Sequence, residues 1–460
     1  MEAIIVVIFI VGYLAITLEH NLKVDKLVPA LLMMALAWAC VAIGIDGFEN
    51  WFDASNHEMV KDFSSLPMEG HHGAASKMGW LEGTLLHHFG KTCEILIFLV
   101  GAMTIVEIID HFNGFSTIKR FIKTNKKATL LWIMCVLAFI LSAIIDNLTA
   151  TIVLITILRK LVPQNKDRIW FAGLIIIAAN AGGAWSPIGD VTTTMLWMGE
   201  KVSTVKLIKY LIVPSFLCML IPTFIASFMK PFKGNFEAPI SEGKENSKGP
   251  LMLYLGLMLI VFVPVFKTLT HLPPYIGMML SLSIVALVAE IISSRQFSMS
   301  SITNEITGNE NSHHQSPTFG ALSKIEMPSI LFFLGILMTV AALESLGLIF
   351  TFGKDVQAAM PLDVFIMLLG GGSAVIDNVP LVAASMGMFE FALDDATWHF
   401  IAYAAGTGGS MLIIGSAAGV VAMGMEKISF FWYLRKIGWL ALIGYLTGAG
   451  SFLFMQHYIF

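Results

Sequence analysis

Charged residues are scarce in this sequence of 460 residues. Asp, Glu, Lys and Arg together make up 13% of the chain, about half the share that is usual in soluble globular proteins. Hydrophobic residues make up 56%, and many apolar runs reach the roughly 20 residues that cross a bilayer as a helix. The composition excludes an ordinary soluble protein and predicts an all-α polytopic membrane protein.

Cysteine is also scarce, and no metal-binding spacing links the four cysteines that are present, which are Cys40, Cys93, Cys135 and Cys218. We therefore expect neither a disulfide framework nor a zinc site. The net charge of −4 is too small to indicate a nucleic-acid partner. The first apolar run, 3–17, lacks the basic start of a signal peptide because Glu2 precedes it, so we interpret it as a membrane helix.

Two matching stretches interrupt the apolar runs. Asp146–Asn147 and Asp377–Asn378 each place an acid beside an amide within an apolar segment. Downstream of each lies a glycine-rich break, Ala178–Asp190 and Ala404–Ser416, and these two breaks align without a gap. A duplication of polar, helix-breaking elements in a hydrophobic chain is typical of transporters built from repeats.

The apolar runs predict helices at 3–19, 27–45, 93–113, 169–198, 205–229, 250–267, 274–293, 327–352, 398–425 and 437–457. They divide the chain into N-terminal scaffold helices with an outer loop (1–92), a first repeat (93–229), cytoplasmic linkers with scaffold helices (230–326) and a second repeat (327–460). Residues 294–325 are expected to form a cytoplasmic loop.

Segments 128–159 and 364–392 are too short for two membrane crossings and too polar in the middle for one plain helix. Basic residues flank the first segment at both ends, whereas Asp363, Asp394 and Asp395 flank the second. By the positive-inside rule the first enters from the cytoplasm and returns, and the second enters from outside. The sequence thus predicts two opposed re-entrant hairpins, two broken helices and inverted repeats. Such backbone needs a protein-lined or watery site at the midplane.

Asp146, Asp190 and Asp377 are acids at membrane depth, where carboxylates are costly and usually mark ion or proton pathways. A buried carboxylate can hold a proton or a small cation, but not comfortably both. That competition is the minimal chemistry of cation/proton exchange.

Nearby amides and hydroxyls supply the oxygen ligands that hard cations prefer. The candidate ligands besides the three acids are Asn147, Thr149, Ser186, Thr192, Thr193, Asn378, Thr407, Ser410 and Ser416. A blander alternative is that the tip acids only cap broken helix ends.

Other acids are candidates for a proton pathway. Glu344 lies in the middle of a predicted helix and is the stronger candidate. Glu107 shares a helix face with Asp110, and either proton relay or salt bridges near the interface would account for this pair. The outer loop 46–92 carries a set of histidines, namely His57, His71, His72, His87 and His88. These histidines could belong to a solvated loop or form a metal site, and the sequence leaves both interpretations open.

The runs 142–151 and 180–193 resemble NhaD-type sodium/proton antiporters, which belong to the ion transporter superfamily together with dicarboxylate, arsenite and citrate carriers. The resemblance implies a homodimer whose protomers each have a scaffold domain and an elevator-type transport domain. It also implies that sodium, and lithium too, is exchanged for protons across the bacterial inner membrane. The transported ion would be the only bound species, with no further cofactor.

The sequence departs from the superfamily at both tips. The sodium-coupled carriers bear Ser-Asn-Thr there, whereas Asp146 and Asp377 stand in place of the serines and Pro380 in place of the second threonine. Two acids favour a cation over an organic anion. Because Pro380 leaves the second tip without a threonine hydroxyl, the tighter sodium site is expected in the first repeat, at Asp146, Asn147, Ser186 and Asp190.

Two rival functions can be weighed. A sodium-coupled anion carrier would need a basic residue at the site, and neither the tips nor the broken helices contain Lys or Arg. An intramembrane aspartyl protease would need one pair of acids and no duplicated hairpins. We therefore expect a transporter rather than an enzyme.

Overall fold

The computed structural model describes residues 1–53, 58–60, 62–68, 76–119, 122, 124–236, 248–307 and 316–459. Within them, eight helices are long and apolar enough to cross a membrane. The described strands are β1 (Phe52–Asp53) and β2 (Glu58–Met59), which pair antiparallel. The expected all-α polytopic membrane protein is confirmed.

The N-terminal part contains α1 (Glu2–Thr17), α2 (Glu19–Leu22), α3 (Leu27–Gly44), η1 (Ile45–Gly47) and η2 (Phe63–Ser65). It is followed by α4 (Lys77–His111), α5 (Ser116–Lys119), α6 (Lys127–Ile145), α7 (Asn147–Leu161), α8 (Asn165–Gly183), α9 (Val191–Met198) and α10 (Thr204–Ser227). The middle contains η3 (Lys230–Phe232), α11 (Gly249–Thr270), α12 (Pro274–Thr307) and α13 (Pro317–Leu322).

The last part contains α14 (Met327–Ser345), α15 (Leu348–Ala359), α16 (Leu362–Ser373), α17 (Asn378–Met388), α18 (Ala396–Gly408) and α19 (Ala417–Glu426). It ends with α20 (Phe430–Tyr433), the π-helical turn η4 (Leu434–Gly438) and α21 (Trp439–Tyr458).

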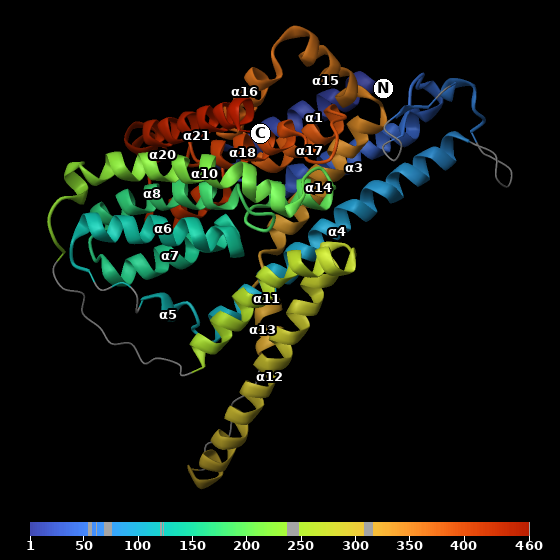
Figure 1. Ribbon diagram of the computed structural model, residues 1–460. Coiled ribbons are helices and arrows are strands. Elements are labelled where there is room, and N and C mark those ends of the chain that lie inside the picture. The colour runs from blue at the N-terminus through green and yellow to red at the C-terminus, as the bar shows by residue number, and fades with distance from the viewer. Residues whose placement is uncertain are drawn as a thin grey trace.

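The helices gather into two groups. In the first, α4 and α14 pack on each other and on α12 and α3, with α1 and α11 alongside. In the second, α6 packs on α8, α16 on α18 and α10 on α21, so elements from both halves of the chain interleave at the left of Figure 1. Contacts of α9 with α4 and of α17 with α14 join the two groups.

The polar tips interrupt the helices where the sequence predicts. Asp146 separates α6 from α7 and has a φ of 77°, a region in which residues other than glycine are strained and which often marks functional sites. Residues 374–377 separate α16 from α17. Asp146–Asn147 and Asp377–Asn378 are called the first tip and the second tip below.

The two broken helices lie beside the tips. Residues 184–190 interrupt the path from α8 to α9, and residues 409–416 interrupt the path from α18 to α19. A Cβ atom on Gly182 would collide with a carbonyl oxygen of α6, and one on Gly408 with a carbonyl oxygen of α16. Glycine at these two equivalent positions permits the close approach of backbone to backbone.

The two halves repeat a side-chain contact as well. The Ser142 hydroxyl donates to the Ala179 carbonyl oxygen at 2.6 Å, and the Ser373 hydroxyl donates to the Ala405 carbonyl oxygen at 2.8 Å. Each bond ties the helix before a tip to the helix that breaks beside it. The duplication read from the sequence therefore has matching contacts in space.

Three sequence-based expectations are wrong. The helix expected at 93–113 begins at Lys77, where Ser76 caps it by accepting from the Gly79 amide at 3.1 Å. His87 and His88 are therefore helical rather than in a loop, and the other three histidines of that set lie outside the described residues. The first turn of α4 is polar at Lys77, whose buried ammonium pairs with Asp46 of η1 at 2.8 Å, a long-range contact that composition does not predict.

The other two corrections concern continuity. The helix expected at 327–352 is two helices, because Gly347 with φ of 69° separates α14 from α15. The loop expected at 294–325 contains the end of α12 and all of α13. Polar composition predicts a loop, but helices can continue beyond the bilayer as polar extensions.

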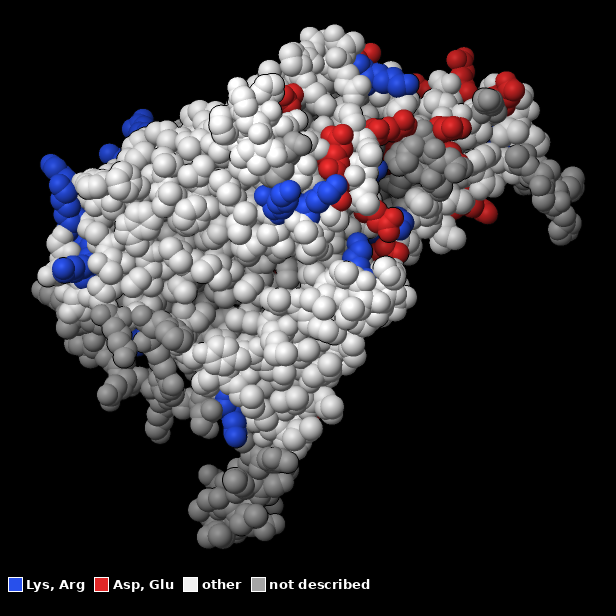
Figure 2. All heavy atoms as spheres, viewed as in Figure 1, with Lys and Arg blue, Asp and Glu red and all other residues white. Residues whose placement is uncertain are grey.

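The surface fits a bilayer. Figure 2 shows a broad uncharged belt between a basic edge near α6 and α8 and an end of mixed charge near α4 and α15. Large apolar side chains are exposed on α1, α3, α11 and α21. In a membrane such side chains face lipid rather than water.

Candidate ion-binding site

Asp190 lies at the centre of the site, in the break before α9, and is only 3% exposed. Its Oδ1 accepts from the Thr192 amide at 3.2 Å and so caps α9. Its Oδ2 accepts from the side-chain amides of Asn147 at 3.3 Å and Asn378 at 3.1 Å. One asparagine from each tip thus meets the same buried carboxylate, which brings together three of the predicted ion-binding residues.

The hydrogen-bond network continues to the second broken helix. Asn147 also donates to the Asn180 side-chain oxygen at 3.0 Å, and Asn180 donates to the Ser416 hydroxyl at 3.1 Å. Ser416 was among the candidate ligands, but Asn180 was not. Asn180 lies within the first glycine-rich break of the sequence, so the position of that break was the signal that could have found it.

Asp146 lies beside this network and is partly buried. Its carboxylate accepts from the Thr149 amide at 2.7 Å and from the Thr149 hydroxyl at 3.0 Å. It therefore caps α7, as the blander reading expected. Asp146, Asn147 and Asp190 also line one cavity of about 60 Å³, enough for a small cation with a few waters since one water needs roughly 10–15 Å³.

Asp377 has a cationic partner that no residue near it in the sequence indicates. Its Oδ1 accepts from the Val379 amide at 3.4 Å, and its Oδ2 lies 3.2 Å from the Lys26 ammonium. Lys26 immediately precedes α3. The tips and the breaks at 184–190 and 409–416 contain no basic residue of their own, but the N-terminal part supplies one to the second tip.

Three further predicted hydroxyls lie in the breaks or, for Thr407, in the last turn of α18, and they bond to backbone. The Ser186 oxygen accepts from the Ile188 amide at 3.4 Å. Thr407 donates to the Tyr403 carbonyl oxygen at 2.6 Å and Ser410 to the Thr407 carbonyl oxygen at 2.7 Å. Within the described residues, none of these three hydroxyls hydrogen-bonds to Asp190 or to a tip side chain.

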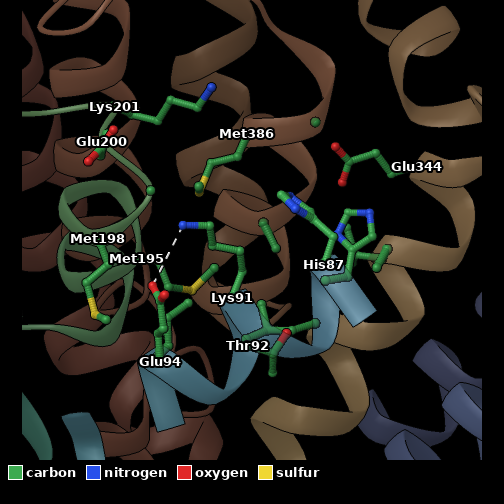
Figure 3. A pocket seen from close by; sticks show the side chains of 18 residues that line it. His87, Lys91, Thr92, Glu94, Met195, Met198, Glu200, Lys201, Glu344 and Met386 are labelled. Atoms are coloured by element: carbon green, nitrogen blue, oxygen red, sulfur yellow. Dashed lines mark ion pairs between the residues drawn. The ribbon is translucent and has the colours of Figure 1, made fainter. Parts of the chain in front are cut away.

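Glu344 faces a separate cavity of about 350 Å³ between α4, α9, α14 and α17. Figure 3 shows its carboxylate directed into this cavity, with Glu200 and Lys201 opposite. A Cβ atom on Gly387 would lie 3.0 Å from the Glu344 carboxyl carbon, so the acid packs directly against α17. Lys201, in the loop after α9, has its pKa lowered by burial, against the opposing effect of the Glu344 and Glu390 carboxylates.

Glu107 lines another cavity, of about 290 Å³, with Asp110, Lys324 and Thr149 of the α7 cap. Lys91, in the cavity of Glu344, and Glu107 lie about 24 Å apart along α4 at a rise of 1.5 Å per residue. The two acids proposed for a proton pathway therefore line different cavities, one beside the middle of α4 and the other beside its C-terminal end.

Comparisons with known families agree on a transporter. Residues 5–408 match the model of the CitMHS family, described as citrate transporters. The chain is 40% identical to sodium/proton antiporter 1 of Arabidopsis thaliana over 97% of this chain and 71% of that protein. It is 35% identical to sodium/proton antiporter 2 of the same plant, over 98% of this chain and 99% of that protein.

Bacterial proteins are similar too. The Na⁺/H⁺ antiporter NhaD of Vibrio cholerae is 28% identical over 98% of this chain and 91% of its own length. Among solved structures, the YdaH transporter of Alcanivorax borkumensis superposes with a TM-score of 0.59 at 13% identity, over 93% of this chain and 98% of that chain. This last likeness concerns the fold alone.

Proposed function

Because the chain belongs to the CitMHS family and, within it, to the NhaD-type sodium/proton antiporters, we propose that it exchanges sodium ions for protons across the membrane. One observation carries the proposal above the others. Asp190 is buried, accepts amide hydrogen bonds from both tips and, among the described residues, has no ion-pair partner. A carboxylate so placed needs a mobile cation or a proton for its neutralisation.

The charge of the site favours a cation over citrate or another organic anion. Asp146, Asp190 and Glu326 line the same cavity together with Lys26, so its carboxylates outnumber its one ammonium and would repel an anion. Lys26 gives the anion-carrier alternative its one supporting observation, together with the family's description as citrate transporters. Since its ammonium is already paired with Asp377, it offers little net positive charge to an anion.

Exchange follows from competition at the acids. A sodium ion from the cytoplasm binds ionised Asp190 and Asp146, with amide and hydroxyl oxygens of Asn147, Thr149 and Ser186 as further ligands. Once the site opens outward, sodium leaves and a proton takes its place on a carboxylate. The protonated site returns and releases the proton inside. Each cycle therefore moves sodium out and protons in.

The proposed alternating access is of the elevator type. The group that holds α6–α9 and α16–α19 would move as the transport domain, with both helix pairs re-entrant and the repeats inverted. The group of α1, α3, α4, α11, α12 and α14 would form the scaffold. In support, the cavity of Glu107 reaches Thr149 near basic residues such as Lys160, whereas the cavity of Glu344 is separate and lies beside the middle of α4. Glu344 and Glu107 are the proposed proton relays of the two access routes.

The remaining elements of the proposal follow the sequence analysis. The exposed apolar scaffold faces would pair two protomers in a homodimer. Lithium, a smaller cation of the same charge, would be exchanged as well. The bacterial inner membrane is the location we propose.

The test uses the full chain in proteoliposomes that contain a pH-sensitive dye and have an acidic lumen. Sodium, lithium, potassium and citrate are added outside in turn, to wild type, to Asp146→Asn and to Asp190→Asn. We expect sodium and lithium to collapse the gradient in wild type and neither variant to respond. Asp167→Asn is the matched control, because Asp167 lies at the start of α8, where it pairs with Lys127 at 2.6 Å.

Each contrary result is informative. If both site variants exchange sodium as wild type does, the site is wrong and the function stands. If citrate alone produces a signal, the chain is an anion carrier.

A further inference from the structure

The two tips are equivalent in sequence but differ in how their acids are neutralised. At the first tip, both Asp146 oxygens accept hydrogen bonds from Thr149, a neutral residue. At the second tip, one Asp377 oxygen accepts from a backbone amide, and the other lies 3.2 Å from the Lys26 ammonium. Only the second acid has an ionic partner within the described part of the chain.

Lys26 is held in place by more than this ion pair. Its ammonium also lies 4.4 Å from the ring centroid of Phe332 on α14, a favourable cation–π distance. The side chains of Lys26 and Asp377 are only 25% and 16% exposed, so water screens the pair weakly. Lys26 and Asp377 line a cavity of about 540 Å³, whose other charged residues, Glu19, Asp25 and Glu326, favour a cation here. Lys26 also lies at the wall of the smaller cavity that holds Asp146 and Asp190, but its hydrogen-bonded partner is Asp377.

A carboxylate at membrane depth is costly unless a positive charge accompanies it. At the second tip that charge is covalently part of the protein. An ammonium and a sodium ion compete for the same carboxylate oxygens, so Asp377 cannot serve both fully at one time.

We propose that Lys26 is the built-in cation of the second tip, so that the Asp146–Asp190 side alone binds the transported sodium. Asp377 then acts as the counter-ion of Lys26 rather than as a sodium ligand. This inference rests on the proposed sodium/proton exchange. It adds that the Lys26 ammonium limits the number of sodium ions that the site holds. Lys26 is in this account a specificity-determining residue, supplied by the scaffold to the transport domain.

The proposal is tested by counting bound sodium with radioactive sodium on the purified full chain in detergent. Lys26→Met removes the ammonium but keeps an apolar chain of similar length. The freed Asp377 then takes a sodium ion, and we expect the sodium bound per protomer to rise up to about twofold. In Lys26→Met/Asp377→Asn the bound sodium returns to the wild-type amount. Lys23→Met, in the same loop and exposed, is the control and binds as wild type.

Two results would overturn the proposal. One is that folded Lys26→Met binds the same amount of sodium as wild type. The other is that the double variant loses sodium binding, which would make Asp377 a sodium ligand. The double variant carries no unpaired charge at this position, so it decides the question even if Lys26→Met does not fold. Failure of the proposed function is separate, since it would appear as wild-type proteoliposomes without sodium-driven proton movement.

Discussion

Replacement of Asp190 by serine separates the charge of this residue from its structural role. Asp190 caps α9, and Ser416, at the equivalent position of the second half, caps α19 by accepting from the Gly419 amide at 3.2 Å. Serine and aspartate are similarly good caps, so the helix start should change in stability by less than about 1 kcal/mol. Asp190→Ser therefore keeps the break folded but removes the carboxylate.

The size of the effect follows from electrostatics. Two unit charges 4 Å apart at an effective dielectric constant of about 20 attract each other by about 4 kcal/mol. Since about 1.4 kcal/mol corresponds to a tenfold change in affinity, sodium should bind about a thousandfold more weakly to Asp190→Ser.

The assay is equilibrium binding of radioactive sodium, with thermal unfolding to establish that the variant is folded. Asp167→Ser serves as the control, because it also removes a carboxylate from the same broken helix but outside the site. If folded Asp190→Ser binds sodium as tightly as wild type, the assignment of Asp190 as the sodium ligand is refuted.

Three further variants probe other parts of the molecule. The buried carboxylate of Glu426 pairs with Arg159 of α7 and Arg168 of α8. Glu426→Gln should lower the free energy of unfolding of the protein by about 3–5 kcal/mol, measured by thermal unfolding. Gly182→Ala should cost about 1–3 kcal/mol by overpacking against α6, whereas Gly371→Ala, with nothing near its Cβ, should be tolerated; equal loss in both would contradict the packing account. Glu344→Gln should bind sodium normally yet exchange it about 100-fold more slowly, as expected for loss of a positioned proton-transfer group; unchanged turnover would remove it from the pathway.

The sequence predicted the parts of the site that depend on local chemistry. Acids within apolar runs located both tips, and paired glycines located both breaks, because these residues are costly or disruptive in a membrane helix. Alignment of the halves placed Ser416 opposite Asp190, and Ser416 belongs to the hydrogen-bond network.

Other features depend on long-range packing and could not be predicted. Lys26 pairs with a residue 351 positions away, and no local pattern marks such a pair. The start of α4 at Lys77 was missed because Gly79 and Gly83 resemble loop residues, and the contact of Lys77 with Asp46 is not visible in the sequence. The hydroxyls of Thr407 and Ser410 were plausible ligands by composition, but their own helix backbone already accepts from them.

The central claim is that sodium and protons compete for one carboxylate site. The most direct measurement titrates purified protein with sodium chloride in weakly buffered detergent and follows proton release with a pH dye. We predict that sodium binding releases protons from wild type and that Asp190→Asn releases none. Tight sodium binding by wild type without any proton release would contradict the exchange account.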